Sequence, residues 1–402
     1  MSSRISTGEF IALVGVMFAT IAFSIDAMLP ALPEIARELS PDEENRAQLI
    51  LTSFVAGMGI GTFFTGPLSD AFGRKPVIYA GVALYVLAAA LAWASTSLET
   101  ILAARVLQGI GAAAPRIVAV AVVRDLYSGR QMARIMSIAM MIFTLFPAVA
   151  PALGAGIIAL TGWRGVFAAF VVFACIMVTW MGLRLDEPLP RENRRPFRAP
   201  LLWGAVQEMF RNPTVRLSIA AQTLCLGILF TMLTMVQPVY DVIFDREETF
   251  PFWFGAVALV SGTASLLNAA VVVRLGMRRL VTWALGSQIV LSGGVLLLSS
   301  MALSDMTSFA IFVFWQASVF GMVGITLGNL NAIAMEPMGH IAGMAASVIG
   351  AISTVLAALI AAPIGLFFDG TLLPLTAAIF TMSVLAFVLM LQMARVEQRV
   401  VA

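Results

Sequence analysis

The chain has 402 residues, of which 60% are hydrophobic and 11% are charged, and its mean hydropathy is +0.96. These values exclude a soluble globular protein, because one water-excluded core of this length could not bury so many apolar residues. A bilayer takes up about 20 apolar residues per spanning helix, so the composition predicts a polytopic membrane protein, and a net charge of +2 gives no reason to expect a nucleic-acid partner.

Apolar runs separated by polar breaks predict twelve transmembrane helices, so the expected fold class is an all-α polytopic membrane protein. The predicted spans are 9–30, 47–68, 76–95, 99–123, 133–158, 164–184, 214–239, 251–273, 280–301, 308–334, 342–367 and 374–394. The longest polar segment, 186–213, follows the sixth span. It divides the chain into an N-terminal six-helix half (1–185), a cytoplasmic linker, and a C-terminal six-helix half (214–402).

The basic residues indicate the orientation of these spans. With the N-terminus in the cytoplasm, eighteen Lys and Arg residues lie on the cytoplasmic side and four lie outside. Positive residues concentrate in cytoplasmic loops, so both termini are expected in the cytoplasm.

Asp26 is the first of three charged residues that lie inside the predicted spans and away from their ends; the others are Arg105 and Arg116. A charge in hydrocarbon is costly unless it faces a polar cavity or a partner, so these residues are the leading functional candidates. A buried carboxyl group can hold and release a proton near neutral pH, which makes Asp26 the candidate coupling site. The alternative is that Asp26 only caps the backbone at the outer membrane interface.

A polar turn between the second and third spans carries the pattern Gly66-x-Leu68-x-Asp70-x-x-Gly73-Arg74-Lys75. This pattern resembles the loop signature of the major facilitator superfamily, whose members are secondary transporters with twelve helices in two halves. The segment from Ile25 to Pro33, with its pattern Ile-Asp-x-x-Leu-Pro-Ala-Leu-Pro, resembles the first span of the bicyclomycin- and chloramphenicol-resistance branch of drug/proton antiporters. Both resemblances imply a transporter of the bacterial inner membrane.

The fourth span contains Arg105-x-x-Gln108-Gly109-x-Gly111, which resembles a superfamily motif whose arginine is associated with proton transfer. Arg105 and Asp26 lie at similar depth below the outer boundary, so we expect them to pair or to exchange partners. The alternative is a static ion pair that orients the first and fourth spans.

Arg116 follows Arg105 by eleven residues, which is close to three helical turns and about 16 Å along the same helix face. This second arginine departs from the superfamily motif. It is expected either to contact an anionic or carbonyl-bearing substrate or to neutralise a helix end.

The resemblance implies a cytoplasmic charge cluster that locks one state of the transporter. The residues expected to form this gate are Gly66, Asp70, Gly73, Arg74 and Asp125. Simple anchoring of the topology by basic residues is the alternative, and it leaves the two aspartates unexplained.

The fifth span carries Pro147, Pro151 and Gly154 in a degraded form of an antiporter motif. Prolines let a helix bend and small residues let helices approach closely, so these three are expected to bend and pack the span. A tightly packed helix pair without a special role is the alternative.

In the second half, polar residues inside spans are candidates to line the substrate path together with Gln108 and Arg116. They are Asn329, Asn331 and Gln237. Such residues also often join helices to one another.

The predicted function is proton-coupled efflux of drug-like or amphipathic small molecules by a monomer, with the proton as coupling ion and no other cofactor. The alternative is a proton-coupled transporter of a small, possibly anionic metabolite on the same fold. An enzyme is not expected, since the spans contain no nucleophile elbow or metal-ligand spacing and the chain has one histidine.

Overall fold

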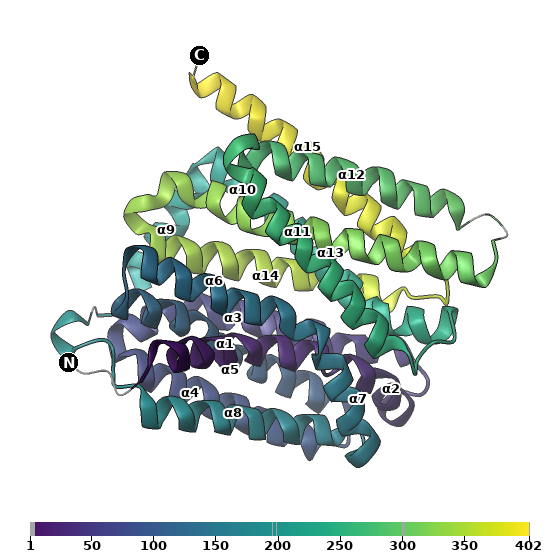
Figure 1. The fold of residues 1–402 in the computed structure, drawn as a ribbon, viewed down its shortest axis with the longest axis horizontal. Helices are drawn as coiled ribbons and strands as arrows, with labels where there is room; N and C mark the ends of the chain where they lie inside the picture. The colour runs from purple at the N-terminus through teal and green to yellow at the C-terminus, as the bar shows by residue number, and fades with distance from the viewer. Residues whose placement is uncertain (1–4, 195, 198, 300, 302, 402) are drawn as a thin grey trace. The chain divides into compact units, whose positions relative to one another are not determined.

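The computed structural model describes residues 5–194, 196–197, 199–299, 301 and 303–401 (Figure 1). Within these residues, all regular structure is helical. Twelve helical segments are long and apolar enough to cross a membrane, which confirms the predicted all-α architecture. They are Thr7–Leu39, Glu44–Phe72, Arg74–Trp93, Leu98–Leu126, Gly129–Ala148, Arg164–Arg184, Pro213–Ile243, Phe250–Leu275, Met277–Leu298, Asp305–Ile341, Gly343–Leu366 and Leu373–Gln398.

The chain forms two compact units, residues 1–199 (unit 1) and 200–402 (unit 2). The α-helices of unit 1 are α1 (Thr7–Asp26), α2 (Leu32–Leu39), α3 (Leu49–Phe72), α4 (Arg74–Trp93), α5 (Leu98–Leu126), α6 (Gly129–Leu145), α7 (Ala150–Thr161) and α8 (Arg164–Arg184). Those after them are α9 (Ala199–Arg211), α10 (Pro213–Pro238), α11 (Phe250–Leu275), α12 (Met277–Leu298), α13 (Asp305–Met335), α14 (Ala342–Leu366) and α15 (Leu373–Val401).

The segment predicted as a linker, 186–213, is partly helical. It contains the short helix η4 (Arg191–Asn193) and most of α9, and the division between the two units falls inside it. Its role as a linker stays a prediction.

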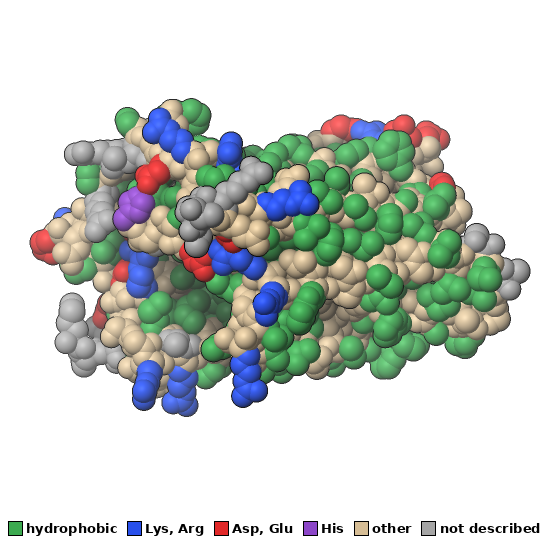
Figure 2. All heavy atoms as spheres, turned by 90° about the horizontal axis from the view of Figure 1, so that it is seen from above, with side chains coloured by type: hydrophobic (Ala, Val, Ile, Leu, Met, Phe, Trp, Pro, Cys, Tyr) green, Lys and Arg blue, Asp and Glu red, His purple; other side chains and the backbone are tan. Residues whose placement is uncertain are grey.

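The spanning helices satisfy their backbone groups internally, as a bilayer requires. Ser97 and Ser304 are the N-cap residues of α5 and α13. Their hydroxyl oxygens accept hydrogen bonds from the backbone N–H groups of Thr100 and Thr307, respectively. On the face drawn in Figure 2, most of the charged side chains lie in the left half of the view, and hydrophobic side chains cover much of the right half.

Gly73 and Gly276 make corresponding turns in the two units. Each lies between two spans with φ of 103° and 82° and an extended ψ, a region that is essentially restricted to glycine. The turn after α3 and the turn after α11 thus share one backbone conformation.

The fifth span is not one continuous helix as predicted for 133–158. It consists of α6, the short helix η3 (Phe146–Ala148) and α7. Pro147 and Pro151 lack the backbone N–H that would continue the hydrogen-bond ladder, so the chain changes direction between them.

Candidate functional site

Asp26 is the last residue of α1, at the point where the first span bends. The bend follows from Pro30, which lies in the short helix η1 (Leu29–Ala31) and cannot donate a backbone hydrogen bond. Only 4% of Asp26 is exposed. No hydrogen bond or ion pair with another described residue holds its carboxyl group, so the group can gain or lose a proton without breaking a contact within the protein.

Arg105 is completely buried on α5. Its guanidinium group donates to the backbone oxygen of Ser24 at 2.9 Å, to that of Ile50 at 3.2 Å and to Oε1 of Gln108 at 2.7 Å. It also lies over the ring of Phe54, 4.2 Å from the ring centroid. The predicted similar depth of Asp26 and Arg105 is therefore correct, because Ser24 is only two residues from Asp26.

Asp26 and Arg105 form no ion pair with each other in the described structure, and the end of α1 gives the reason; an exchange of partners stays a prediction. The backbone N–H of Met28 bonds the oxygen of Ile25 rather than that of Ser24, which leaves the Ser24 carbonyl free to accept from Arg105. Carbonyl groups from α1 and α3 thus solvate the guanidinium group in place of a carboxylate.

Ser24 and Tyr85 extend this polar cluster to α4, a contact that sequence reasoning missed. Their hydroxyl groups lie 2.7 Å apart, and Ser24 Oγ also donates to the backbone oxygen of Thr20. Tyr85 is one of only four tyrosines in the chain, and a buried tyrosine hydroxyl usually has a partner, which is the signal that could have revealed it.

Gln108, predicted to line the substrate path, is completely buried and holds Arg105 instead. Its Nε2 has no hydrogen-bond partner in the described structure. A role in contacting substrate stays a prediction.

Glycines fix the position of α5. A Cβ atom at Gly109 would overlap the backbone oxygen of Phe54, and one at Gly57 would overlap that of Val106. The backbones of α3 and α5 therefore touch, which holds Arg105 against α3 and α1. Gly154 on α7 makes the same kind of contact with the backbone of Ala27, next to Asp26, so the fifth span packs directly on the candidate proton site.

Arg116 lies on the same face of α5 as Arg105 but differs from it in having no partner. It is partly exposed, and it forms no hydrogen bond or ion pair with any described residue. An unpaired cation inside a span is costly, and both expected roles of Arg116, contact with an anionic or carbonyl-bearing substrate and neutralisation of a helix end, stay predictions.

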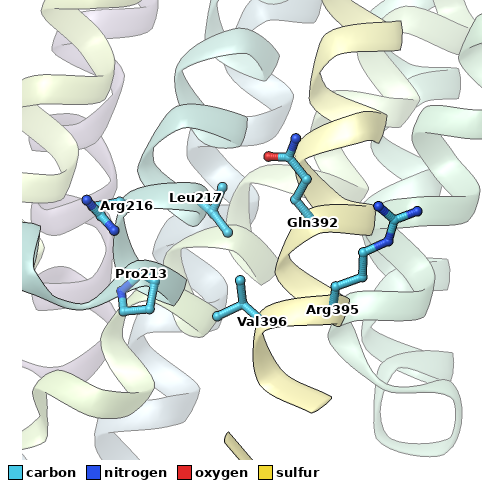
Figure 3. A pocket seen from close by; sticks show the side chains of 6 residues that line it. All are labelled: Pro213, Arg216, Leu217, Gln392, Arg395 and Val396. Atoms are coloured by element: carbon cyan, nitrogen blue, oxygen red, sulfur yellow. The ribbon is translucent and has the colours of Figure 1, made fainter. Parts of the chain in front are cut away.

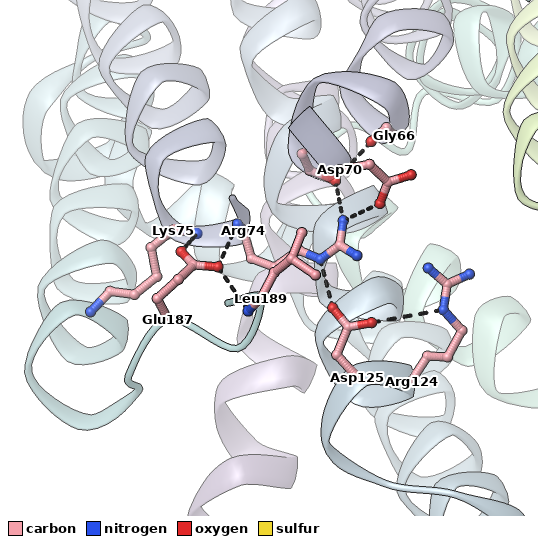
Figure 4. A network of polar contacts seen from close by, with 9 residues as sticks. Gly66, Asp70, Arg74, Lys75, Arg124, Asp125, Glu187 and Leu189 are labelled. Atoms are coloured by element: carbon pink, nitrogen blue, oxygen red, sulfur yellow. Dashed lines mark hydrogen bonds and ion pairs between the residues drawn. The ribbon is translucent and has the colours of Figure 1, made fainter. Parts of the chain in front are cut away.

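At the other end of these spans, Arg74 joins two aspartates as the gate prediction requires (Figure 4). Its Nη1 lies 2.6 Å from Oδ1 of Asp70, and its Nε lies 2.7 Å from Oδ2 of Asp125. Arg74 is 2% exposed, and Ser69 accepts a further hydrogen bond from it. The backbone oxygen of Gly66 in turn accepts from Ser69. The structure thus ties the ends of α3, α4 and α5 together, while a gating role stays a prediction.

Glu187 completes this cluster from outside the spans, and sequence reasoning missed it. Its carboxylate accepts the backbone N–H groups of Arg74 and Lys75 at 2.8 and 2.9 Å, so it caps the N-terminus of α4 (Figure 4). Lys75 donates to the backbone oxygens of Gly182 and Leu185. In the sequence, an acidic residue shortly after the sixth span is only a weak sign of a helix cap. The fold is needed to show that Glu187 binds the start of α4.

The contacts of the candidate residues in unit 2 say less about their function. Asn329 is buried and donates to Oδ1 of Asn268 at 2.8 Å, so it joins α13 to α11. Gln237 is buried and Asn331 is half-buried, and neither forms a hydrogen bond with another described residue through its side chain. Their roles in the substrate path stay predictions.

Comparison with known proteins assigns these features to a family. Residues 12–362 match the model of the Major Facilitator Superfamily. A bicyclomycin resistance protein homolog from Haemophilus influenzae is 31% identical over 88% of this chain and 87% of its own length. The multidrug resistance protein MdtL of Vibrio parahaemolyticus is 28% identical over 81% of each chain. A solved structure of a D-xylose-proton symporter shares the fold, with a TM-score of 0.73 over 95% of this chain and 97% of that one at 15% identity.

Proposed function

Because the chain belongs to the major facilitator superfamily, we propose that this multi-pass membrane transporter exports drug-like or amphipathic small molecules in exchange for protons. Relatives named for bicyclomycin and multidrug resistance support the direction and the substrate class. The proposed location is the bacterial inner membrane, with both termini in the cytoplasm, and the proposed working form is a monomer.

The observation that carries the proton coupling is the unpaired, buried carboxyl group of Asp26 beside a buried, fixed arginine. Arg105 bonds the backbone oxygen of Ser24, two residues before Asp26. Since carbonyl groups hold Arg105, a small movement of the end of α1 relative to α5 would change the surroundings of Asp26 without breaking an ion pair. Gly154 contacts the backbone at Ala27, so movement of α7 would be transmitted to this point.

The proposed gate is the network of Arg74 with Asp70 and Asp125. Charged groups at close range hold helix ends together and can separate when a transporter changes state. Glu187 would tie the segment after α8 to the same event, because it binds the first backbone N–H groups of α4.

Proton movement in inverted membrane vesicles tests the proposal. An imposed pH gradient should be dissipated by at least one compound of a drug panel with the unmodified protein, and by none with Asp26→Asn. Asp42→Asn, an exposed aspartate beyond α2, is the matched control and should behave as the unmodified protein. Equal dissipation by all three proteins would contradict the role of Asp26.

Arg116 favours a second candidate, proton-coupled transport of a small anionic metabolite. Its unpaired guanidinium group within a span suits a carboxylate or phosphate better than a lipophilic cation. The same vesicle measurement separates the two candidates: if small anions move protons and no drug does, the efflux proposal fails.

A further inference from the structure

A hollow in unit 2 lies away from the residues proposed for transport. It has a volume of about 370 Å³ and is formed where α10 begins and α15 nears its end. The lining residues are Pro213, Arg216, Leu217, Gln392, Arg395 and Val396. In Figure 3, Leu217 and Val396 lie at its centre, and the guanidinium groups of Arg216 and Arg395 lie on its opposite sides.

The two arginines have no acidic partner. Both are exposed, and neither forms an ion pair with any described residue. Two acidic groups of the same unit are bound to another arginine: Arg278 lies 2.8 Å from Glu336 and 2.7 Å from Glu397.

His340 similarly binds Glu208 at 2.7 Å. The hollow therefore carries positive charge that its own unit leaves uncompensated.

An apolar stripe leads away from this charge along the membrane-spanning part of α15. Leu385 and Val388 are exposed and share a helix face with Gln392 and Arg395, at a spacing of three or four residues. On α10, Leu217 is followed by Leu224 on one face, and both are half-exposed. The hollow thus has two arginines at the end of the spans, and apolar side chains continue beyond its lining along α15 and α10.

We propose that this hollow binds one anionic phospholipid. The phosphate would lie between Arg216 and Arg395, whose long side chains can turn toward it because no ion pair holds them. An acyl chain would follow Val388 and Leu385. Arginine binds phosphate through its planar set of donors, and basic pockets between spanning helices suit lipid head groups. The apolar stripe favours a lipid over free phosphate, and this proposal stands whether or not the transport proposal is correct.

Native mass spectrometry of the full-length protein in a neutral detergent tests the proposal, with phosphatidylglycerol and phosphatidylcholine as probes. The unmodified protein should retain one phosphatidylglycerol in preference to phosphatidylcholine. Arg216→Gln combined with Arg395→Gln should weaken that preference by about 30-fold, since each arginine near a lipid head group contributes roughly fivefold. Arg274→Gln with Arg279→Gln removes the same charge from exposed positions at the ends of α11 and α12 and should change little.

Two further measurements make the outcome decisive. The melting temperature of both double variants should match that of the unmodified protein. If the arginine variant does not fold, Leu217→Ala serves as a charge-neutral replacement, and it should also reduce lipid retention. Equal loss in both arginine double variants would show nonspecific charge attraction and overturn the proposal. Complete displacement of the lipid by inorganic phosphate would also overturn it, in favour of a simple anion site.

Discussion

At the scale of single residues, Arg105 shows how this protein accommodates a buried charge without a carboxylate. Its donors point to backbone oxygens of two different helices and to one side-chain amide. Only the planar guanidinium group can serve acceptors in these separate directions at once. Arg105 therefore joins α1, α3 and α5, and it contacts α1 two residues before Asp26.

We predict that Arg105→Lys loses most transport although it keeps the charge. A lysine ammonium group is compact and cannot reach all three acceptors, so buried carbonyl groups would be left without a donor, which costs about 1–3 kcal/mol each. Transport in vesicles should fall at least tenfold and the melting temperature should decrease. Arg46→Lys, at a part-exposed ion pair with Glu99, is the control, and equal behaviour of the two variants would contradict the prediction.

The sequence identified Asp26, Arg105 and Arg116 correctly as the charges inside spans, because hydrocarbon makes such residues conspicuous. It could not identify the backbone partners of Arg105. The oxygens of Ser24 and Ile50 have no signature in the residue types, and that of Ser24 is available only because α1 ends where it does. Tyr85 was missed since its contact with Ser24 depends on how α4 packs on α1.

At the scale of elements, glycine determines how closely helices approach. The contact of α3 with α5 brings backbone against backbone at Gly57 and Gly109, and the contact at Gly154 does the same beside Asp26. Small residues matter more here than in a soluble protein, because lipid gives apolar side chains no reason to prefer a neighbouring helix.

Gly109→Ala should therefore destabilise the protein. The added Cβ would overlap the Phe54 carbonyl oxygen, so α5 must shift, and we expect the free energy of unfolding to fall by about 1–3 kcal/mol. Gly156→Ala meets no atom within 4 Å and should be neutral or slightly stabilising. Unfolding in mixed micelles measures both variants, and an unchanged stability for Gly109→Ala would refute the packing argument.

The charge network at the end of α3, α4 and α5 gives a second prediction at this scale. Asp125→Asn removes one of the two carboxylates that hold the buried Arg74, so the helix ends should separate more readily. We expect substrate binding to persist while turnover falls at least tenfold, measured as Kd and efflux rate. Arg124→Gln alters only a 4.0 Å contact of an exposed side chain with Asp125; if it slowed turnover as much, the network would not be the cause.

The spanning helices and their order could be predicted from the apolar runs, whereas two local features could not. The break between α6 and α7 was signalled by Pro147 and Pro151, but a proline inside a span permits either a bend or a break, and only packing decides between them. Helix α9 lies in the segment 186–213, which was predicted only as a linker with no helix assigned to it.

At the scale of the whole molecule, composition alone excluded a soluble fold, and the turn after the second span was enough to indicate the family. The polar residues of unit 2 indicated much less about the substrate path. Asn329 pairs with Asn268 in the structure, and a residue list cannot distinguish such helix-joining contacts from residues that bind substrate.

The orientation of the spans is a prediction that labelling can check. The test uses two single-cysteine variants, one at Arg191 before the seventh span and one at Asp42 after the first span. The two positions should lie on opposite sides of the membrane, because the basic residues favour a cytoplasmic N-terminus. In a variant without Cys175 and Cys225, an impermeant maleimide added to intact cells should label position 42 and not position 191. Labelling of position 191 alone would reverse the topology.

The most direct test of proton coupling is the release of protons when substrate binds to the purified transporter. A weakly buffered detergent solution with a pH indicator should record about one proton released per substrate bound by the unmodified protein. Asp26→Asn should release none while still binding substrate. Undiminished release from Asp26→Asn would contradict the account and place the coupling proton on another group.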